Sequence, residues 1–176
     1  MRGATPHNIV AVLILAAACT DEPSSSSPTG TVDTGPTYDI PCAVRGEPAL
    51  DVAHATDPWG LDEAAIGCGI PPQGGAPYAR FRTRTRNLDL SDGGAVAFEL
   101  VDLDTNEVIG GAALTMGFVC ANVGDDADHW VGGEVHARFD GYTVEELLGR
   151  QVVVTATLEG DGQTVTAEGT GTLSPL

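Results

Sequence analysis

QVVVTATL (residues 151–158), EGDG (159–162) and TVTAEGTGTL (164–173) together form the stretch that decides the fold. In the first segment apolar residues occupy every second position, which is the period of a β-strand with one buried face. The Asp-Gly pair in the middle segment is typical of a tight hairpin turn. The last segment alternates apolar residues with threonines. The stretch therefore predicts a β-hairpin with one apolar face and one solvated threonine face.

Similar alternation predicts further strands along the chain. These are residues 95–103 and 108–116, which form a second hairpin, residues 130–139, residues 80–86, and a short run at Leu50 and Val52. In the third of these segments the side chains expected to face inward are Val131, Val135, Ala137 and Phe139.

Helical signals are few and short. Thr143 followed by Glu146 forms a capping box, and Gly149 provides a stop, so about one turn of helix is expected there. Asp57-Pro58 is the expected start of a second short helical segment ending at Gly67.

About six or seven strands with frequent turn signals predict an all-β fold, an antiparallel sandwich with one or two short helical turns. An open β-barrel is the alternative. The turn of helix that leads directly into residues 151–158 loosely resembles the corner of immunoglobulin-like domains, although the Cys…Trp…Cys spacing of antibody domains is absent. The resemblance implies an immunoglobulin-like sandwich.

The N-terminus carries an export signal. Arg2 precedes an apolar run over residues 9–18, which is too short to span a bilayer as a helix. Leu15-Ala16-Ala17-Ala18-Cys19 resembles the lipobox of bacterial lipoprotein precursors, with Ala16 where the commonest pattern has leucine. In that family the cysteine thiol receives a diacylglyceryl group and the preceding peptide bond is cut. The alternative is cleavage by an ordinary signal peptidase, which would release a secreted protein.

The resemblance implies a chain in three parts. Residues 1–18 are the signal peptide, residues 19–37 are lipidated Cys19 with a disordered Ser/Thr/Pro linker, and residues 38–176 are a single β-domain. The family's location is the bacterial cell envelope, with the membrane as partner through the lipid anchor. Because Thr20, and not aspartate, follows the cysteine, the family's inner-membrane retention signal is absent, which favours the outer membrane.

Three further cysteines remain after Cys19, namely Cys42, Cys68 and Cys120. In an oxidising compartment an odd number predicts one disulfide and one free thiol. All three pairings are open from the sequence.

The charge of the chain is strongly acidic, at −17 with 25 acidic residues, and its eight basic residues are all arginine. Such a charge excludes nucleic acid as a partner. Four arginines, Arg80, Arg82, Arg84 and Arg86, are expected on one face of one strand; this set is called the arginine stripe below. It is a candidate surface for an anionic glycan or an envelope protein. The alternative is cross-strand pairing with residues such as Glu99 or Glu134.

Catalytic motifs are missing from the sequence. There is no lysine, which excludes Schiff-base chemistry and a Walker-type phosphate loop, and neither Ser91 nor Ser174 lies in a Gly-x-Ser-x-Gly elbow. We therefore expect no catalytic residues, no metal and no cofactor. Two metal hypotheses are weaker alternatives: a metal-assisted site at Glu134 and His136, and a calcium loop at residues 125–128.

These observations predict an envelope-anchored lipoprotein whose β-domain is a non-catalytic binding or structural module. The alternatives are a secreted metal-assisted hydrolase and an accessory subunit of an envelope complex.

Lipidation is testable by metabolic labelling. Cells that produce the chain and are fed a labelled fatty acid are expected to label it. Cys19→Ala should remove the label because it removes the acceptor thiol, whereas Cys68→Ala should keep it. If the wild-type chain takes up no label, the lipoprotein hypothesis is wrong.

Overall fold

The structure is a computed structural model that describes residues 41–55 and 57–176. The predicted signal peptide, Cys19 and the linker lie outside the described residues. Tyr38–Leu176 forms one compact unit. Among the described residues, no helix has the length and hydropathy needed to cross a bilayer.

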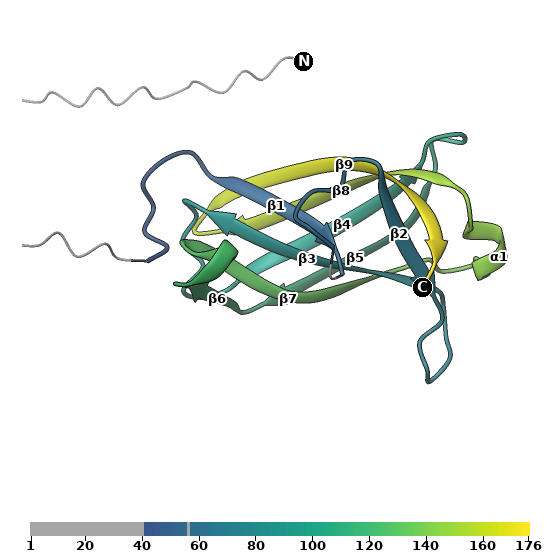
Figure 1. Cartoon of the computed structure of the whole chain (residues 1–176), viewed down its shortest axis with the longest axis horizontal. Helices are drawn as coiled ribbons and strands as arrows, with labels where there is room; N and C mark the ends of the chain where they lie inside the picture. The colour runs from purple at the N-terminus through teal and green to yellow at the C-terminus, as the bar shows by residue number, and fades with distance from the viewer. Residues whose placement is uncertain (1–40, 56) are drawn as a thin grey trace, which may run out of the picture. The chain divides into compact units, whose positions relative to one another are not determined.

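The described residues form nine strands and two short helical turns, joined by loops (Figure 1). The strands are β1 (Ala49–His54), β2 (Ala64–Gly69), β3 (Tyr78–Arg86), β4 (Gly94–Asp102), β5 (Val108–Met116), β6 (Phe118–Ala121), β7 (His129–Arg138), β8 (Gln151–Gly160) and β9 (Gln163–Pro175). The helical turns are the 3₁₀ turn η1 (Gly124–Asp126) and the α-helix α1 (Val144–Leu147).

All the strands belong to one hydrogen-bonded sheet, in the order β1-β3-β2-β9-β8-β4-β5-β7-β6. Because β3 also pairs with β7, the sheet closes into a barrel-like ring of seven strands. β1 and β6 lie outside this ring, paired with β3 and β7 respectively. The predicted all-β, mainly antiparallel fold with short helical turns is confirmed.

The hairpin predicted from residues 151–173 is present as β8 and β9, with Leu158 opposite Val165. Asp161 and Gly162 form its turn with positive φ angles of 46° and 70°, the conformation that an Asp-Gly pair favours. The predicted capping box is also present. The Thr143 hydroxyl accepts from the Glu146 N–H at 3.4 Å, and the Glu146 carboxylate accepts from the Thr143 N–H at 2.8 Å.

The expectation of a second helical segment between Asp57 and Gly67 is wrong, because no helix forms there. Residues 64–69 are strand β2, which pairs in parallel with the C-terminal part of β9. Its sequence AAIGCG has little strand character of its own, but Ile66 and Cys68 are buried in the core. The long β9 offers a free edge, and burial against it outweighs local propensity.

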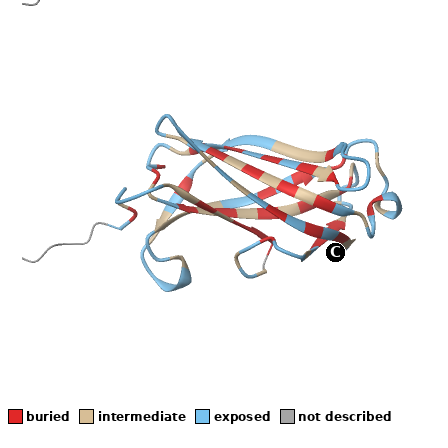
Figure 2. Cartoon of the chain, turned by 90° about the horizontal axis from the view of Figure 1, so that it is seen from above, coloured by how far each residue is buried: buried red, intermediate tan, exposed pale blue. Residues whose placement is uncertain are grey.

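Side chains alternate between the interior and the surface along most strands, as the burial colours of Figure 2 show. In β7 the alternation breaks at Gly132-Gly133, where a bulge lies opposite β3 between Arg82 and Arg84. Val131 therefore pairs with the outward-facing Arg84 and the exposed Val119, and it faces outward. The expectation that Val131 faces the core is wrong because the extra residue reverses the phase of the strand.

One disulfide, Cys42–Cys120, joins the start of the described chain to β6, with the two Cα atoms 5.9 Å apart. Of the three pairings left open by the sequence, this is the one that forms. Cys68 is the free cysteine of the described residues and is buried. Burial raises the pKa of its thiol, which keeps the thiol protonated and unreactive.

Closure of the ring depends on a close approach between β2 and β9 at Gly171. A Cβ atom added there would lie 2.5 Å from the side chain of Ile66 and 2.8 Å from the carbonyl oxygen of Ala64. Gly171→Ala is expected to lower the free energy of unfolding by about 1–3 kcal/mol, the usual cost of overpacking. The matched control is Gly117→Ala, where the added Cβ meets nothing within 4 Å and a change within about 0.5 kcal/mol is expected. Equal denaturation midpoints for the two variants would contradict this role of the β2–β9 contact.

Candidate functional site

The arginine stripe lies on the outer face of β3. Between its members Phe81, Thr83 and Thr85 are fully buried, so the guanidinium groups are directed away from the core. Arg80, Arg82 and Arg84 are half-buried, and Arg86 is exposed at the end of the strand. The predicted placement on one strand face is confirmed, and what the stripe does depends on the partners of each arginine.

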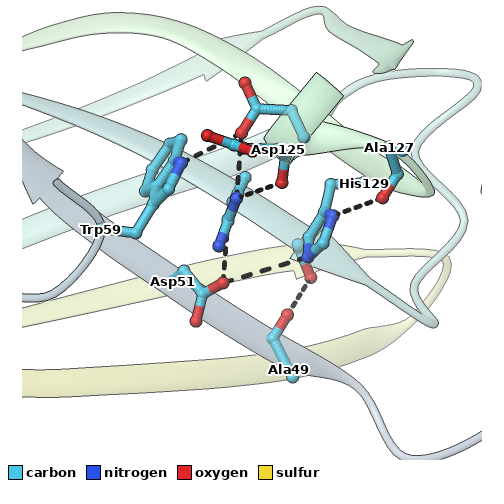
Figure 3. A network of polar contacts seen from close by, with 9 residues as sticks. Ala49, Asp51, Trp59, Asp125, Ala127 and His129 are labelled. Atoms are coloured by element: carbon cyan, nitrogen blue, oxygen red, sulfur yellow. Dashed lines mark hydrogen bonds and ion pairs between the residues drawn. The ribbon is translucent and has the colours of Figure 1, made fainter. Parts of the chain in front are cut away.

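Arg84 is held by three acidic residues of two other segments. Its Nε donates to Asp51 of β1 at 2.9 Å, and its Nη1 donates to the Asp126 carboxylate at 3.0 Å and to the Asp125 carbonyl at 2.8 Å. Figure 3 shows Asp51, Asp125 and Trp59 around this centre. The side chain of Arg84 is only 14% exposed, so its charge is matched inside the structure. Arg84 therefore fastens β1 and η1 to β3.

Trp59 covers the middle of the stripe. The guanidinium carbons of Arg82 and Arg84 each lie 4.5 Å from the centroid of its ring, so two cations stack on one indole. The indole N–H donates to Asp126 at 3.0 Å, and Arg82 donates to the Asp57 carbonyl at 2.5 Å. These contacts hold the loop before β2 against β3. The middle of the stripe therefore has a structural role.

The acidic residues 125–128, which the sequence raised as a calcium loop, bind donors of the chain itself. Asp126 accepts from Arg84 and Trp59, and Asp128 accepts from the backbone N–H of Cys42 at 3.4 Å. Across residues 41–55 and 57–176, no three His, Cys, Asp or Glu side chains are placed together to hold a metal ion.

At the other end of the stripe, β3 meets the C-terminal half of β7. Arg80 Nη1 lies 3.6 Å from the carboxylate of Glu134, and His136 Nε2 lies 2.8 Å from the same carboxylate. Arg138 Nη2 lies 3.3 Å from Asp140. Glu134 is thus a cross-strand partner of the stripe, while Glu99 lies on β4 opposite Gly111 and Thr155. This end of the stripe is far less enclosed, since the side chains of His136 and Arg138 are 54% and 61% exposed.

A hollow of about 210 Å³ opens beside this end of the stripe. The β2–β3 loop forms one wall; it stands away from the ring near the C-terminus of the chain (Figure 1). The side chains that line the other wall are Tyr78, His136 and Arg138. The rings of Tyr78 and His136 lie 4.8 Å apart, tilted by 37°. The hollow therefore combines an aromatic face, a guanidinium and an imidazole.

A second imidazole–carboxylate pair, which the sequence does not reveal, lies between the end of β1 and the loop that follows it, and its imidazole also contacts β2. His54 Nδ1 lies 3.0 Å from Asp57, and His54 Nε2 accepts from the Gly67 N–H at 3.0 Å. The pair anchors β2 beside β1.

None of the three described cysteines, Cys42, Cys68 and Cys120, is placed to act as a nucleophile. Cys120, which neighbours His129 and His136 in the sequence, is bonded to Cys42, and Cys68 is buried. Another internal ion pair joins the last residue of β4 to the residue before β8, where Arg150 donates to Asp102 at 2.8 Å. The hydrogen bonds from Arg150 and from the Thr105 backbone hold the pKa of Asp102 below its usual value.

Basic groups are unevenly distributed over the ring. β4, β5, β8 and β9 contain no arginine, lysine or histidine. β3 and β7 carry five of the eight arginines and two of the four histidines. The β3–β7 face is therefore the surface on which cationic and aromatic side chains are concentrated.

Comparison with known proteins gives no family. Neither protein-family models nor curated proteins match the chain. Among solved structures, it is similar to a β-glucuronidase of Parabacteroides merdae, at 12% identity over 65% of this chain and a TM-score of 0.36. The chain spans 14% of the length of that enzyme. It is also similar to the CooA pilin subunit of enterotoxigenic Escherichia coli, at 14% identity, 72% of this chain, 99% of that chain and a TM-score of 0.32. Likenesses of this size identify no function.

The structural role of Arg84 leads to a prediction about the stability of the protein. Arg84→Ala is expected to lower the free energy of unfolding by about 1–3 kcal/mol, because it removes the Arg84 hydrogen bond to Asp51 and one of the two donors of Asp126. Arg86→Ala is the matched control on the same strand face and should change it by less than about 0.5 kcal/mol. Chemical denaturation of the two variants checks this, and an unchanged midpoint for Arg84→Ala would show that the network contributes nothing.

Proposed function

We propose that the protein is a lipid-anchored envelope protein whose β-domain is a non-catalytic binding module, with its ligand site in the hollow at the Tyr78 end of the arginine stripe. The observation that carries the binding role is this hollow, because it joins an aromatic face to solvent-accessible polar side chains within one loop-walled cavity.

The anchoring part of the proposal rests on the sequence. Cys19 follows a short apolar run and precedes a serine-rich linker, as in lipoprotein precursors. The disulfide Cys42–Cys120 suits an oxidising compartment, which supports export. A lipid anchor followed by a linker would hold the binding domain at a surface while leaving its faces accessible.

The preference for binding over catalysis rests on how the polar groups are paired. Glu134 is shared between Arg80 and His136, and Arg138 is paired with Asp140. Such mutual pairing fixes side chains as a recognition surface. A metal-assisted hydrolase at Glu134 and His136 would need a third ligand, and the described residues place none beside them.

The test is binding to the producing cell's own envelope. The full chain, extracted in mild detergent, is expected to bind sedimented envelope fragments that have been stripped of protein. Arg138→Ala combined with His136→Ala should weaken this binding by about tenfold or more, because truncation of central contacts typically costs over 1 kcal/mol.

The control is Thr166→Ala, an exposed position on β9, where cationic side chains are absent. It should bind like the wild type. If the wild-type chain does not bind, or if the double variant binds equally well, the proposal is wrong.

A further inference from the structure

The charges around the hollow are balanced. Of the side chains that line it, Arg138 is paired with Asp140 at 3.3 Å and His136 with Glu134 at 2.8 Å, and Glu134 also lies 3.6 Å from Arg80. An anionic ligand would have to compete with Asp140 for Arg138 and with Glu134 for His136. The pairing therefore weakens any attraction of the hollow for a charged group.

The same arrangement offers hydrogen-bond donors and acceptors side by side. Guanidinium groups only donate, carboxylates only accept, and an imidazole can do either. A sugar hydroxyl is both a donor and an acceptor, so neighbouring hydroxyls of one ring match such an alternating surface. A sugar can therefore bind here through its hydroxyl groups without carrying a charge.

The aromatic wall supplies the second part of a sugar site. Tyr78 lines the hollow at the start of β3, with its ring held against His136. The CH groups on one face of a pyranose ring are apolar, and they pack against the face of an aromatic ring while the hydroxyls reach polar groups at the edge.

The loop wall limits the size of the ligand. Pro71 and Pro77 flank it, and Gly74 and Gly75 have positive φ angles of 79° and 120°, a conformation that favours glycine. The Gly74 N–H donates to the Pro71 carbonyl at 2.8 Å, which closes a turn. The hollow is half open, and its volume of about 210 Å³ is smaller than that of a typical drug-sized pocket, so it suits one ring and not an extended segment.

We propose that the hollow formed by the β2–β3 loop, Tyr78, His136 and Arg138 binds one uncharged pyranose unit of a glycan. This inference rests on the proposed function, because it names the ligand class of the same site.

The experiment uses the full chain in mild detergent and an immobilised panel of uncharged hexose oligosaccharides with the matching uronic acid oligosaccharides. At least one uncharged member is expected to bind, and binding should persist at high salt because no charge neutralisation is involved. Tyr78→Ala should weaken binding by about tenfold or more, whereas Tyr78→Phe keeps the ring and should retain it. Arg138→Ala provides a second test at an exposed position that does not support the fold.

The outcomes separate the two proposals. If only uronic acid oligosaccharides bind, or if salt abolishes binding, the uncharged-sugar inference is overturned. The same holds if no uncharged sugar binds while the chain still binds envelope fragments through His136 and Arg138. If the chain binds neither sugars nor envelope fragments, the proposed function itself fails.

Discussion

β3 can face the core on one side only if the arginines on its other side find partners. A half-buried guanidinium without a counter-charge or hydrogen-bond acceptor costs several kcal/mol, which is a large share of the stability of a domain this size. The protein meets this constraint by bringing other segments to β3. Asp51 comes from β1, Asp125 and Asp126 come from η1, and Trp59 comes from the loop before β2.

This constraint separates the structural part of β3 from the proposed binding surface along a single strand. In the middle, Arg82 and Arg84 are covered by Trp59 and have no freedom to meet a ligand. Toward the start of β3, Arg80 is paired with Glu134 of β7, which remains accessible together with His136, and Tyr78 opens onto the hollow. The same alternation therefore produces a closed network in the middle of the stripe and the proposed recognition surface toward the start of β3.

The sequence predicts those elements whose signals are local. Alternation and an Asp-Gly turn define the β8–β9 hairpin, and the Thr143 capping box defines α1. β2 escapes prediction because its strand character comes from a parallel neighbour far along the chain. The orientation of Val131 is mispredicted for a similar reason, since the bulge at Gly132-Gly133 is evident only from the β3–β7 pairing.

Part of the candidate site can be predicted from the sequence. The stripe on β3 is visible from spacing, and so are Glu134, His136 and Arg138 on one face of β7. That these two faces adjoin is a property of strand order, which no local pattern contains. Tyr78 lies two residues before Arg80 and is therefore on the same face of β3. This spacing places Tyr78 beside the stripe, although the run of alternating arginines does not include it.

The most direct test of this division of β3 is backbone amide NMR of the full chain in detergent, titrated with an oligosaccharide that it binds. Shifts are predicted to concentrate in residues 71–78 and 134–138, with the Trp59 indole N–H unchanged. Shifts concentrated instead at Trp59 and Arg84, or on the threonine face of β8 and β9, would contradict the account.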